Sequence, residues 1–235
     1  MIPFHLDQLA TILCLGAHPD DIEIGCGGTI LDLLAHRPSL EVHWLVLSGD
    51  TRRREEAIRS GERFLMGATH KRIVVEAFRD SFFPYEGPAI KEYFHGLQQE
   101  LDPDLIFTHR REDMHQDHRL VAELTWNTFR NHLIVEYEIP KYEGDLGSPN
   151  VFTALSEETC RAKIDMLVDC FPSQHAKPWF SRETFWALLR LRGLECQSPS
   201  GCAEGLYCRK AVLSAAPATC DPATAFTDMC QALPG

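Results

Sequence analysis

The feature of this sequence that most constrains its fold is an alternation of short apolar runs with longer segments of helical spacing. Five runs of four to seven residues, rich in isoleucine, leucine and valine, have the length and composition of buried strands. They cover residues 11–17, 41–47, 72–75, 105–108 and 133–137. Strands that alternate with helices are joined by right-handed crossovers into a mostly parallel sheet.

We therefore expect a Rossmann-like α/β fold, in which a mostly parallel sheet carries helices on both faces. Ligands of such sheets bind outside the carboxyl ends of the strands, so the active site is expected there. The helices expected between these strands cover residues 29–34, 52–66, 90–101 and 116–132. The later third is less regular, with a loop at 140–153, helices at 156–170 and 182–191, and a strand at 206–213.

The chain is expected to form one domain over residues 1–215, followed by a loosely ordered tail over residues 216–235. The length of 235 residues exceeds a typical domain, yet α/β folds often pass 200 residues as one unit. The tail contains mostly alanine, proline, threonine and cysteine, and it offers no periodic apolar face to bury.

Charge and hydropathy exclude several classes of function. Acidic side chains number 34 and basic ones 23, a net charge of −11, which argues against non-specific nucleic-acid binding and against an anionic membrane surface as partner. No apolar run approaches the ~18–20 residues of a membrane span, and the start lacks the pattern of a secretory signal. We expect a soluble, cytoplasmic protein whose oligomeric state, including a homo-oligomer, is open.

The nine cysteines are spread along the chain, and in a protein without a signal segment free thiols are expected. Cys196, Cys202 and Cys208 recur every six residues. Paired ligands in structural zinc sites are spaced more tightly, usually with two to four residues between them. No cysteine metal cluster is therefore expected.

Two polar clusters follow expected strands and carry the chemistry. His18-Pro19-Asp20-Asp21 comes directly after the first strand, and His115-Gln116-Asp117-His118 follows the fourth strand after a short loop. Because parallel strands end at the same edge of a sheet, the two clusters are expected to converge. Either of His109 and Asp113, in the loop before the second cluster, could line the same pocket or face solvent.

Together the clusters supply the donors of a catalytic metal site. Such a zinc site uses three nitrogen or oxygen ligands and keeps one position open for water. His18, Asp21 and His118 would provide that set, and Asp20 and His115 would remain beside it without coordinating. A free carboxylate can take a proton from water, and a free imidazole can meet an oxyanion. Asp117 is suited to orient a ligand imidazole.

At these residues the chain resembles the PIG-L/LmbE-like family of zinc-dependent N-deacetylases. The first family motif reads Ala17-His18-Pro19-Asp20-Asp21-Ile22-Glu23, with Ile22 where glutamate is commonest, and the second reads His115-Gln116-Asp117-His118, with Gln116 where proline is frequent. Neither departure touches an expected ligand. Weaker agreement extends the resemblance over residues 11–213, in the segments 47–50, 78–80, 102–106, 171–174 and 203–207.

The resemblance implies a role for each motif residue. His18, Asp21 and His118 match the metal ligands, with Zn²⁺ as the expected cofactor, although iron or cobalt also suits two imidazoles and a carboxylate. Asp20 matches the general base, and His115 matches the histidine that stabilises the oxyanion. Asp117 is grouped with these catalytic residues as the partner of an imidazole.

Two further residues fall near family positions that hold sugar hydroxyls, namely Arg54 and Asp80. The register of the cluster Arg52-Arg53-Arg54 is open, because a solvated face at the start of a helix would carry the same residues. Asp80 follows the third strand and so lies at the expected active edge.

The resemblance therefore implies a metal-dependent hydrolase that removes the acetyl group from a small N-acetylated amino sugar or sugar conjugate. One alternative keeps the reaction type but changes the substrate to a non-sugar acyl-amine of a natural-product pathway. Another is an inactive binding protein with a structural metal, against which the presence of Asp20 and His115 argues. A dinucleotide-binding protein is discounted, because no GxGxxG follows the first strand.

Overall fold

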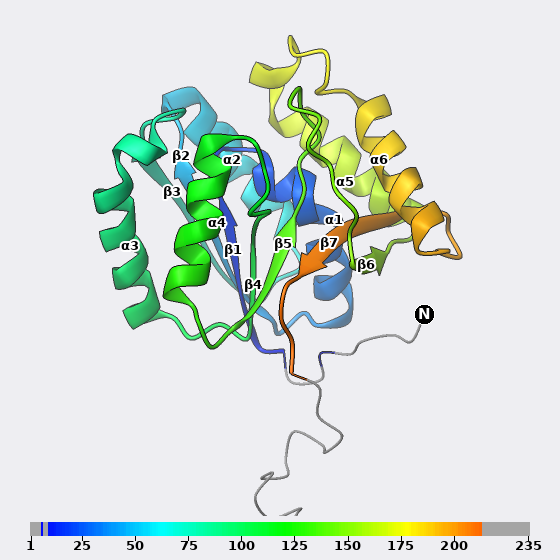
Figure 1. Cartoon of the computed structure of the whole chain (residues 1–235). Helices are drawn as coiled ribbons and strands as arrows, with labels where there is room; N and C mark the ends of the chain where they lie inside the picture. Colours follow the sequence, from blue (N-terminus) through cyan, green and yellow to red (C-terminus); the bar gives the residue numbers. More distant parts are fainter. Residues whose placement is uncertain (1–5, 7–8, 213–235) are drawn as a thin grey trace, which may run out of the picture.

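The computed structural model describes residue 6 and residues 9–212, and in this part of the chain seven strands form a single sheet (Figure 1). The order across the sheet is β3-β2-β1-β4-β5-β7-β6. The strands are β1 Thr11–Gly16, β2 Glu41–Ser48, β3 His70–Phe78, β4 Leu105–His109, β5 Leu133–Tyr137, β6 Val151–Ala154 and β7 Ala203–Cys208. The expected tail at residues 216–235 lies outside the described residues.

Strands β1 to β5 pair in parallel, which confirms the expected α/β fold. The α-helices are α1 Asp21–His36, α2 Thr51–Phe64, α3 Gly87–Glu100, α4 Gln116–Thr128, α5 Glu157–Cys170 and α6 Arg182–Glu195. Two 3₁₀ turns, η1 Phe83–Tyr85 and η2 Pro172–Gln174, lie between them. Helix α1 starts at Asp21, the last residue of the first polar cluster, and so earlier than the expected position near residue 29.

The far edge of the sheet differs from expectation. The end of the segment expected as a loop, residues 151–153, belongs to β6, and both β6 and β5 pair antiparallel with β7. β7 begins at Ala203 and ends at Cys208, so it lies earlier than the strand expected at 206–213. β6 is only four residues long and mostly half-buried, so its sequence carries little of the apolar alternation that marks a strand.

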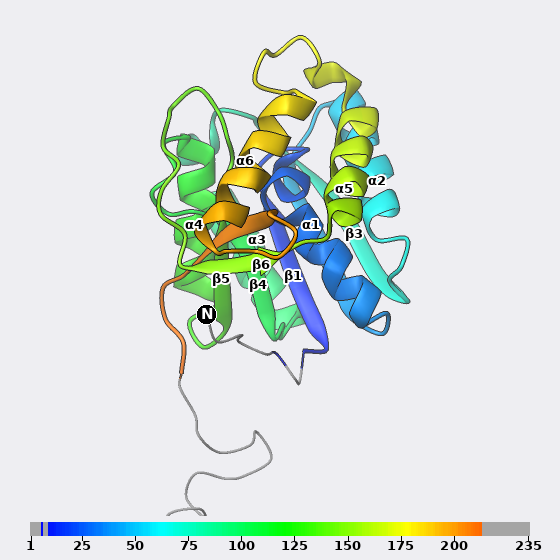
Figure 2. The ribbon, with the colours of Figure 1, turned by 90° about the vertical axis from the view of Figure 1, so that its right-hand side faces the viewer.

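The two faces of the sheet carry separate apolar cores. Alternate residues of β1 point to opposite faces, as the twofold period of a strand requires: Ile12 and Cys14 join the core under α1, α2, α5 and α6, and Leu13 and Leu15 join the core under α3 and α4. Figure 2 shows α1, α2 and α5 together on the first face. Both faces of the central strands are therefore buried.

The crossovers change direction between β1 and β4, the two neighbouring strands at the centre of the sheet. β1 leads into α1 on one face, and β4 leads into α4 on the other. This is the topological switch point at which open α/β sheets bind ligands. Both polar motifs follow these two strands, so the fold brings them to one crevice.

A glycine lets α1 lie directly against the sheet. A Cβ atom built on Gly25 would lie 2.1 Å from Cδ2 of Tyr137, whose ring is fully buried and whose hydroxyl donates to the carbonyl of Leu15. Since α1 begins at Asp21, directly after Asp20, this close packing also positions the first motif relative to the sheet.

We expect Gly25→Ala to destabilise the protein by about 1–3 kcal/mol, the usual effect of forcing extra atoms into a packed core. The free energy of unfolding from urea denaturation measures this effect. The matched control is Gly96→Ala in α3, where no atom lies within 4 Å of the added carbon. That change should stabilise the helix by about 0.5–1 kcal/mol. A Gly25→Ala protein with the wild-type midpoint would contradict the packing argument.

No helix among the described residues is both long enough and apolar enough to cross a membrane. The cysteines in this part of the chain are free thiols, and Cys196 and Cys208 are the more exposed among them. Cys202 is buried in the core beneath α5 and α6.

Candidate metal centre and pocket

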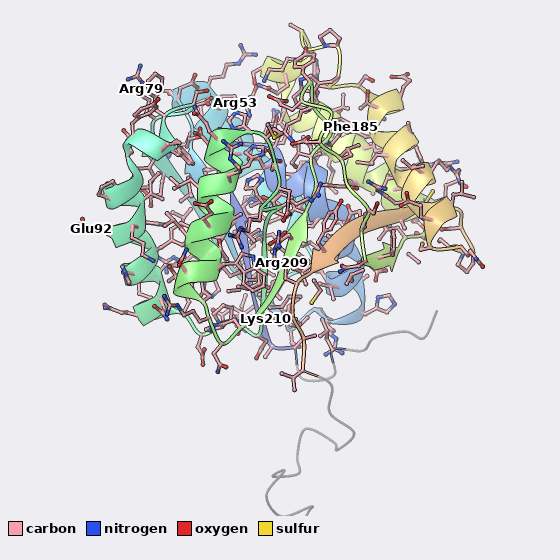
Figure 3. All side chains as sticks on the ribbon, viewed as in Figure 1. Arg53, Arg79, Glu92, Phe185, Arg209 and Lys210 are labelled. Atoms are coloured by element: carbon pink, nitrogen blue, oxygen red, sulfur yellow. The ribbon has the colours of Figure 1, made fainter. Side chains whose placement is uncertain are left out.

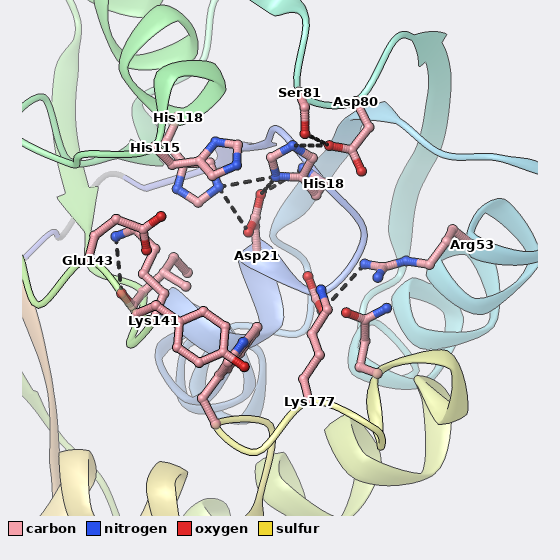
Figure 4. Close-up of a pocket in the computed structure, with 15 residues that line it drawn as sticks. His18, Asp21, Arg53, Asp80, Ser81, His115, His118, Lys141, Glu143 and Lys177 are labelled. Atoms are coloured by element: carbon pink, nitrogen blue, oxygen red, sulfur yellow. Dashed lines mark hydrogen bonds and ion pairs between the residues drawn. The ribbon is translucent and has the colours of Figure 1, made fainter.

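The first motif forms a tight turn between β1 and α1. The Oδ2 atom of Asp21 accepts a hydrogen bond from the backbone N–H of His18 at 2.7 Å, which closes the turn on itself. Asp20 is the residue before the helix, but its side chain makes no capping hydrogen bond to the helix N-terminus. Asp20 and Asp21 are both buried and line the crevice. Figure 4 shows Asp21 beside His18.

The three side chains expected to bind the metal converge. Nδ1 of His18 lies 3.1 Å from Nε2 of His118 and 3.4 Å from Oδ2 of Asp21, and Nε2 of His118 lies 3.5 Å from Oδ1 of Asp21. A tetrahedral zinc ion with bonds of about 2.0–2.1 Å holds its donor atoms about 3.3–3.4 Å apart. The distances, which reach a different oxygen of Asp21 from each histidine, are close to this spacing, so the three residues have the donor chemistry and the proximity to hold a zinc ion.

Other donor sets overlap with this one. One ring nitrogen each from His18, His115 and His118 also lie within 4.8 Å of one another, as do donors of Asp21, His109 and His118. Geometry alone therefore admits His115 as a ligand, and a measurement on the His115 variant has to separate the two assignments.

Each of the two candidate ligand histidines, His18 and His118, has a carboxylate on its other ring nitrogen. Oδ2 of Asp117 lies 3.1 Å from Nε2 of His18, and Asp117 is fixed by the backbone N–H groups of Ser81 and Phe83. A carboxylate in this position holds the tautomer of the imidazole and increases its basicity as a ligand. Asp117 lies fully buried at the start of α4, in the position expected for an orienting residue.

The corresponding partner of His118 is Asp113, whose role the sequence left open. Its Oδ2 atom lies 3.0 Å from Nδ1 of His118, and its Oδ1 atom accepts from the backbone N–H of His115 at 2.7 Å. Burial favours the protonated acid, but His118 and the ammonium of Lys141 hold the pKa of Asp113 below its usual range. Asp113 is 2% exposed, so it is part of the site and not of the solvent-facing loop.

His109, the last residue of β4, lies beneath the site. Its ring stacks on His118 with centroids 3.9 Å apart, and its Nε2 atom lies 3.2 Å from Oδ2 of Asp21. The backbone N–H of Ala17 also donates to Nε2 of His109. The side chain is fully buried and does not line the pocket. His109 therefore contacts two of the candidate ligands, Asp21 and His118.

Asp20 combines burial with a nearby positive charge. Its Oδ2 atom lies 3.3 Å from Nη2 of Arg53, and the same guanidinium group donates to the carbonyl of Pro19. Burial raises the pKa of Asp20 to about 7, against the opposing effect of Arg53. A carboxylate whose pKa lies near neutrality is well suited to accept and return a proton. The backbone of Asp20 has a φ of 98°, in the left-handed region.

His115 starts α4 with its ring in the pocket, 4.9 Å from the ring of His18 between centroids. Its Nδ1 atom accepts a hydrogen bond from the backbone N–H of Asp117 at 3.3 Å. Burial and the neighbouring His18 lower the pKa of His115. A neutral ring whose Nδ1 accepts must carry its proton on Nε2. This arrangement favours a neutral N–H donor over an imidazolium.

The structure brings Asp80 to the pocket but not Arg54. Oδ1 of Asp80 lies 3.3 Å from Nε2 of His18, and the rest of this carboxylate is exposed to the pocket opening. The guanidinium of Arg54 instead donates to the carbonyl of Val75 in β3. The expectation for Arg54 is therefore corrected: its neighbour Arg53 lines the pocket, at the carboxyl end of the sheet (Figure 3).

The pocket has a volume of about 290 Å³. The motif residues form its floor, and two loops form its walls: the β5–β6 loop and the segment around η2 (Figure 4). The remaining residues that line it are Ser81, Ile139, Lys141, Tyr142, Glu143, Gln174, Lys177 and Trp179. The polar floor and the aromatic side chains of the walls give it the character of a site for a polar small molecule.

Comparison with known protein families shows to which family the chain belongs. Residues 13–129, which include both motifs and every residue of the expected metal site, match the PIG-L family, described as GlcNAc-PI de-N-acetylase. The chain belongs to the PIG-L family. A comparison with curated protein sequences gave no significant match.

Several solved structures resemble the chain over most of its length. The conserved protein TT1542 from Thermus thermophilus has a TM-score of 0.69 at 20% identity and covers 91% of this chain and 100% of its own. N,N'-diacetylchitobiose deacetylase from Pyrococcus horikoshii has a TM-score of 0.62 at 19% identity and covers 86% of this chain and 84% of its own.

A third similar structure is described by a different reaction. GalB, the 4-carboxy-2-hydroxymuconate hydratase from Pseudomonas putida KT2440, has a TM-score of 0.63 at 18% identity and covers 89% of this chain and 100% of its own. At these identities the likeness shows the fold alone, and one fold supports several reactions. Membership of the PIG-L family assigns the chain to the hydrolytic deacetylases, and the substrate has to be argued from the pocket.

Proposed function

We propose that the protein is a zinc-dependent N-deacetylase that releases acetate from an N-acetylated amino sugar or sugar conjugate. One observation carries the proposal: His18, Asp21 and His118 converge at the spacing of zinc ligands, with Asp20 and His115 beside them. A structural zinc site is closed by four protein ligands and needs neither a nearby general base nor a nearby hydrogen-bond donor for an oxyanion. A hydrolytic site needs both.

The chain's own residues supply the proton transfers. A zinc ion bound by His18, Asp21 and His118 would act as a Lewis acid and would lower the pKa of a nearby water. The Asp20 carboxylate takes a proton from the attacking water as the oxygen bonds to the amide carbon. The Nε2–H of His115 donates to the amide oxygen as negative charge develops there. When the C–N bond breaks, Asp20 returns the proton to the amine nitrogen, and acetate and the free amine leave.

An amino sugar suits the walls of the pocket. Asp80, with most of its carboxylate exposed, can accept hydrogen bonds from sugar hydroxyls, and Tyr142, which also lines the pocket, is 72% exposed. Aromatic rings provide apolar surface on which a sugar ring can stack. The PIG-L family is described by GlcNAc-PI and one similar structure by N,N'-diacetylchitobiose, which are both N-acetylated sugar conjugates.

The runner-up is deacylation of a non-sugar acyl-amine, in which the reaction and its catalytic residues stay the same. The specific observation behind it is that Tyr142, Glu143 and Lys177, three of the polar side chains that line the walls, are exposed. A different amine could therefore occupy the same space. The two candidates differ only in the amine that is released.

The test is a panel of N-acetylglucosamine derivatives and simple N-acetyl amines, scored for free amine with and without chelator. We expect turnover of at least one sugar derivative, abolished by the chelator and restored by added zinc. Turnover of simple amines alone would favour the runner-up. Turnover that persists after the metal has been removed would contradict the zinc-dependent mechanism.

A further inference from the structure

A lysine in the β5–β6 loop lies almost buried next to the proposed metal site. The side chain of Lys141 is 8% exposed, although lysine is rarely buried unless it is paired. Its Nζ atom lies 2.9 Å from Oδ2 of Asp113 and 2.8 and 2.7 Å from the two carboxylate oxygens of Asp145. Lys141 therefore bridges two carboxylates from different segments of the chain.

The first of these carboxylates is the one that holds His118. The same oxygen, Oδ2 of Asp113, receives both Nζ of Lys141 and Nδ1 of His118, at 2.9 and 3.0 Å. A continuous chain of contacts thus leads from the ammonium of Lys141 through the carboxylate of Asp113 to the imidazole of His118. Its far end, Nε2 of His118, is the atom that faces Asp21 and His18.

The second carboxylate attaches the loop to the motif. Oδ2 of Asp145 accepts from the backbone N–H of Met114 at 2.6 Å, and the guanidinium of Arg110 donates to the carbonyl of Asp145. Without the ammonium, the carboxylates of Asp113 and Asp145 would be close like charges with no cation between them. Repulsion between them would favour a shift of Asp113 away from its position on His118.

We propose that Lys141 is a positioning residue for the metal ligand His118, acting through the carboxylate of Asp113. The proposal rests on the proposed function, since it requires His118 to bind zinc. It adds that the metal site is completed by a residue of the β5–β6 loop, which also supplies Tyr142 and Glu143 to the pocket wall. One loop then serves both the metal and the substrate.

The first test measures the zinc affinity of the metal-free protein by competition with a chromophoric chelator. Partners behind a metal ligand typically contribute 10–100-fold in affinity. We expect Lys141→Met to weaken zinc binding about 10-fold and Lys141→Arg to recover most of the loss. The matched control is Lys177→Met, a lysine of the same pocket that is exposed and packs near the ring of Trp179. It should leave zinc affinity unchanged.

A double-mutant cycle then tests whether Lys141 affects zinc affinity through Asp113. In an Asp113→Asn background, Lys141→Met should add less than about 2-fold, because variants that act through one partner are not additive. Unchanged or tighter zinc binding in Lys141→Met, or fully additive losses, would overturn the proposal. If Lys141→Met does not fold, Lys141→Gln and Lys141→Arg give the same comparison. Wild-type protein that binds no zinc would contradict the proposed function itself, whereas equal binding by wild type and variant contradicts only the role of Lys141.

Discussion

Asp20→Asn is expected to lower kcat at least about 10²-fold, in line with the contribution of a general base, while the bound zinc stays near one equivalent. Asparagine keeps the size of the side chain and an oxygen that can face Arg53, but it cannot accept the proton of the attacking water. The zinc donors are unaffected, because Asp20 does not belong to the set formed by His18, Asp21 and His118.

The measurement is kcat on the substrate found in the panel, with zinc content determined on the same preparation. Thermal unfolding of the variant is the control for folding. An Asp20→Asn enzyme that retains most of its turnover with full zinc would remove Asp20 from the role of base. Loss of zinc together with activity would instead make it a ligand or a support of one.

His115→Ala is expected to lower kcat by about 10²–10³, the usual effect of removing one donor to a developing oxyanion. The ring lines the pocket, and because its Nδ1 atom accepts from the backbone N–H of Asp117, the proton of the neutral ring is on Nε2 before substrate binds. Since the donor acts mainly in the transition state, KM should change only a few-fold.

The spacing of His18, His115 and His118 would also allow His115 to bind the metal. The zinc content of the variants distinguishes a metal ligand from a hydrogen-bond donor. His115→Ala should retain zinc, and His118→Ala should lose it. Equal loss of zinc from the two variants would show that His115 is a ligand and that the division of roles within the second motif is wrong.

The sequence predicts the central part of this fold well because local signals and tertiary structure agree there. The strands β1, β2, β4 and β5 are buried on both faces, so each reads as a mainly apolar run. The two motifs follow β1 and β4, whose carboxyl ends form the switch point. Convergence of the motifs therefore follows from the strand order, with no knowledge of the loops.

The choice between Arg53 and Arg54 depends on the register of α2, which the cluster of three arginines does not reveal. Neighbouring residues on a helix point about 100° apart. The side chain of Asp50 caps the helix by accepting from the N–H of Arg53, and this start turns Arg53 toward Asp20 and Arg54 toward β3. The sequence predicts a helix here, but not its direction relative to the pocket.

The role of Asp113 depends on contacts that no local pattern encodes. Its partner Lys141 is 28 residues further along the chain, in a segment that resembles an ordinary loop. Whether the Asp113 carboxylate is exposed or buried depends on whether a cation such as Lys141 contacts it. The sequence therefore identified the candidate ligands and the candidate base, and the supporting carboxylate of His118 required the structure.

The backbone of Asp20 has a consequence for any attempt to stabilise this protein. A left-handed conformation at a residue other than glycine costs about 1–3 kcal/mol, and a glycine there would avoid it. Selection for heat resistance alone would therefore favour Asp20→Gly, which removes the carboxylate proposed as the base. A search for thermostable variants has to score turnover alongside melting temperature, because at this position the most stable sequence and the active sequence are different.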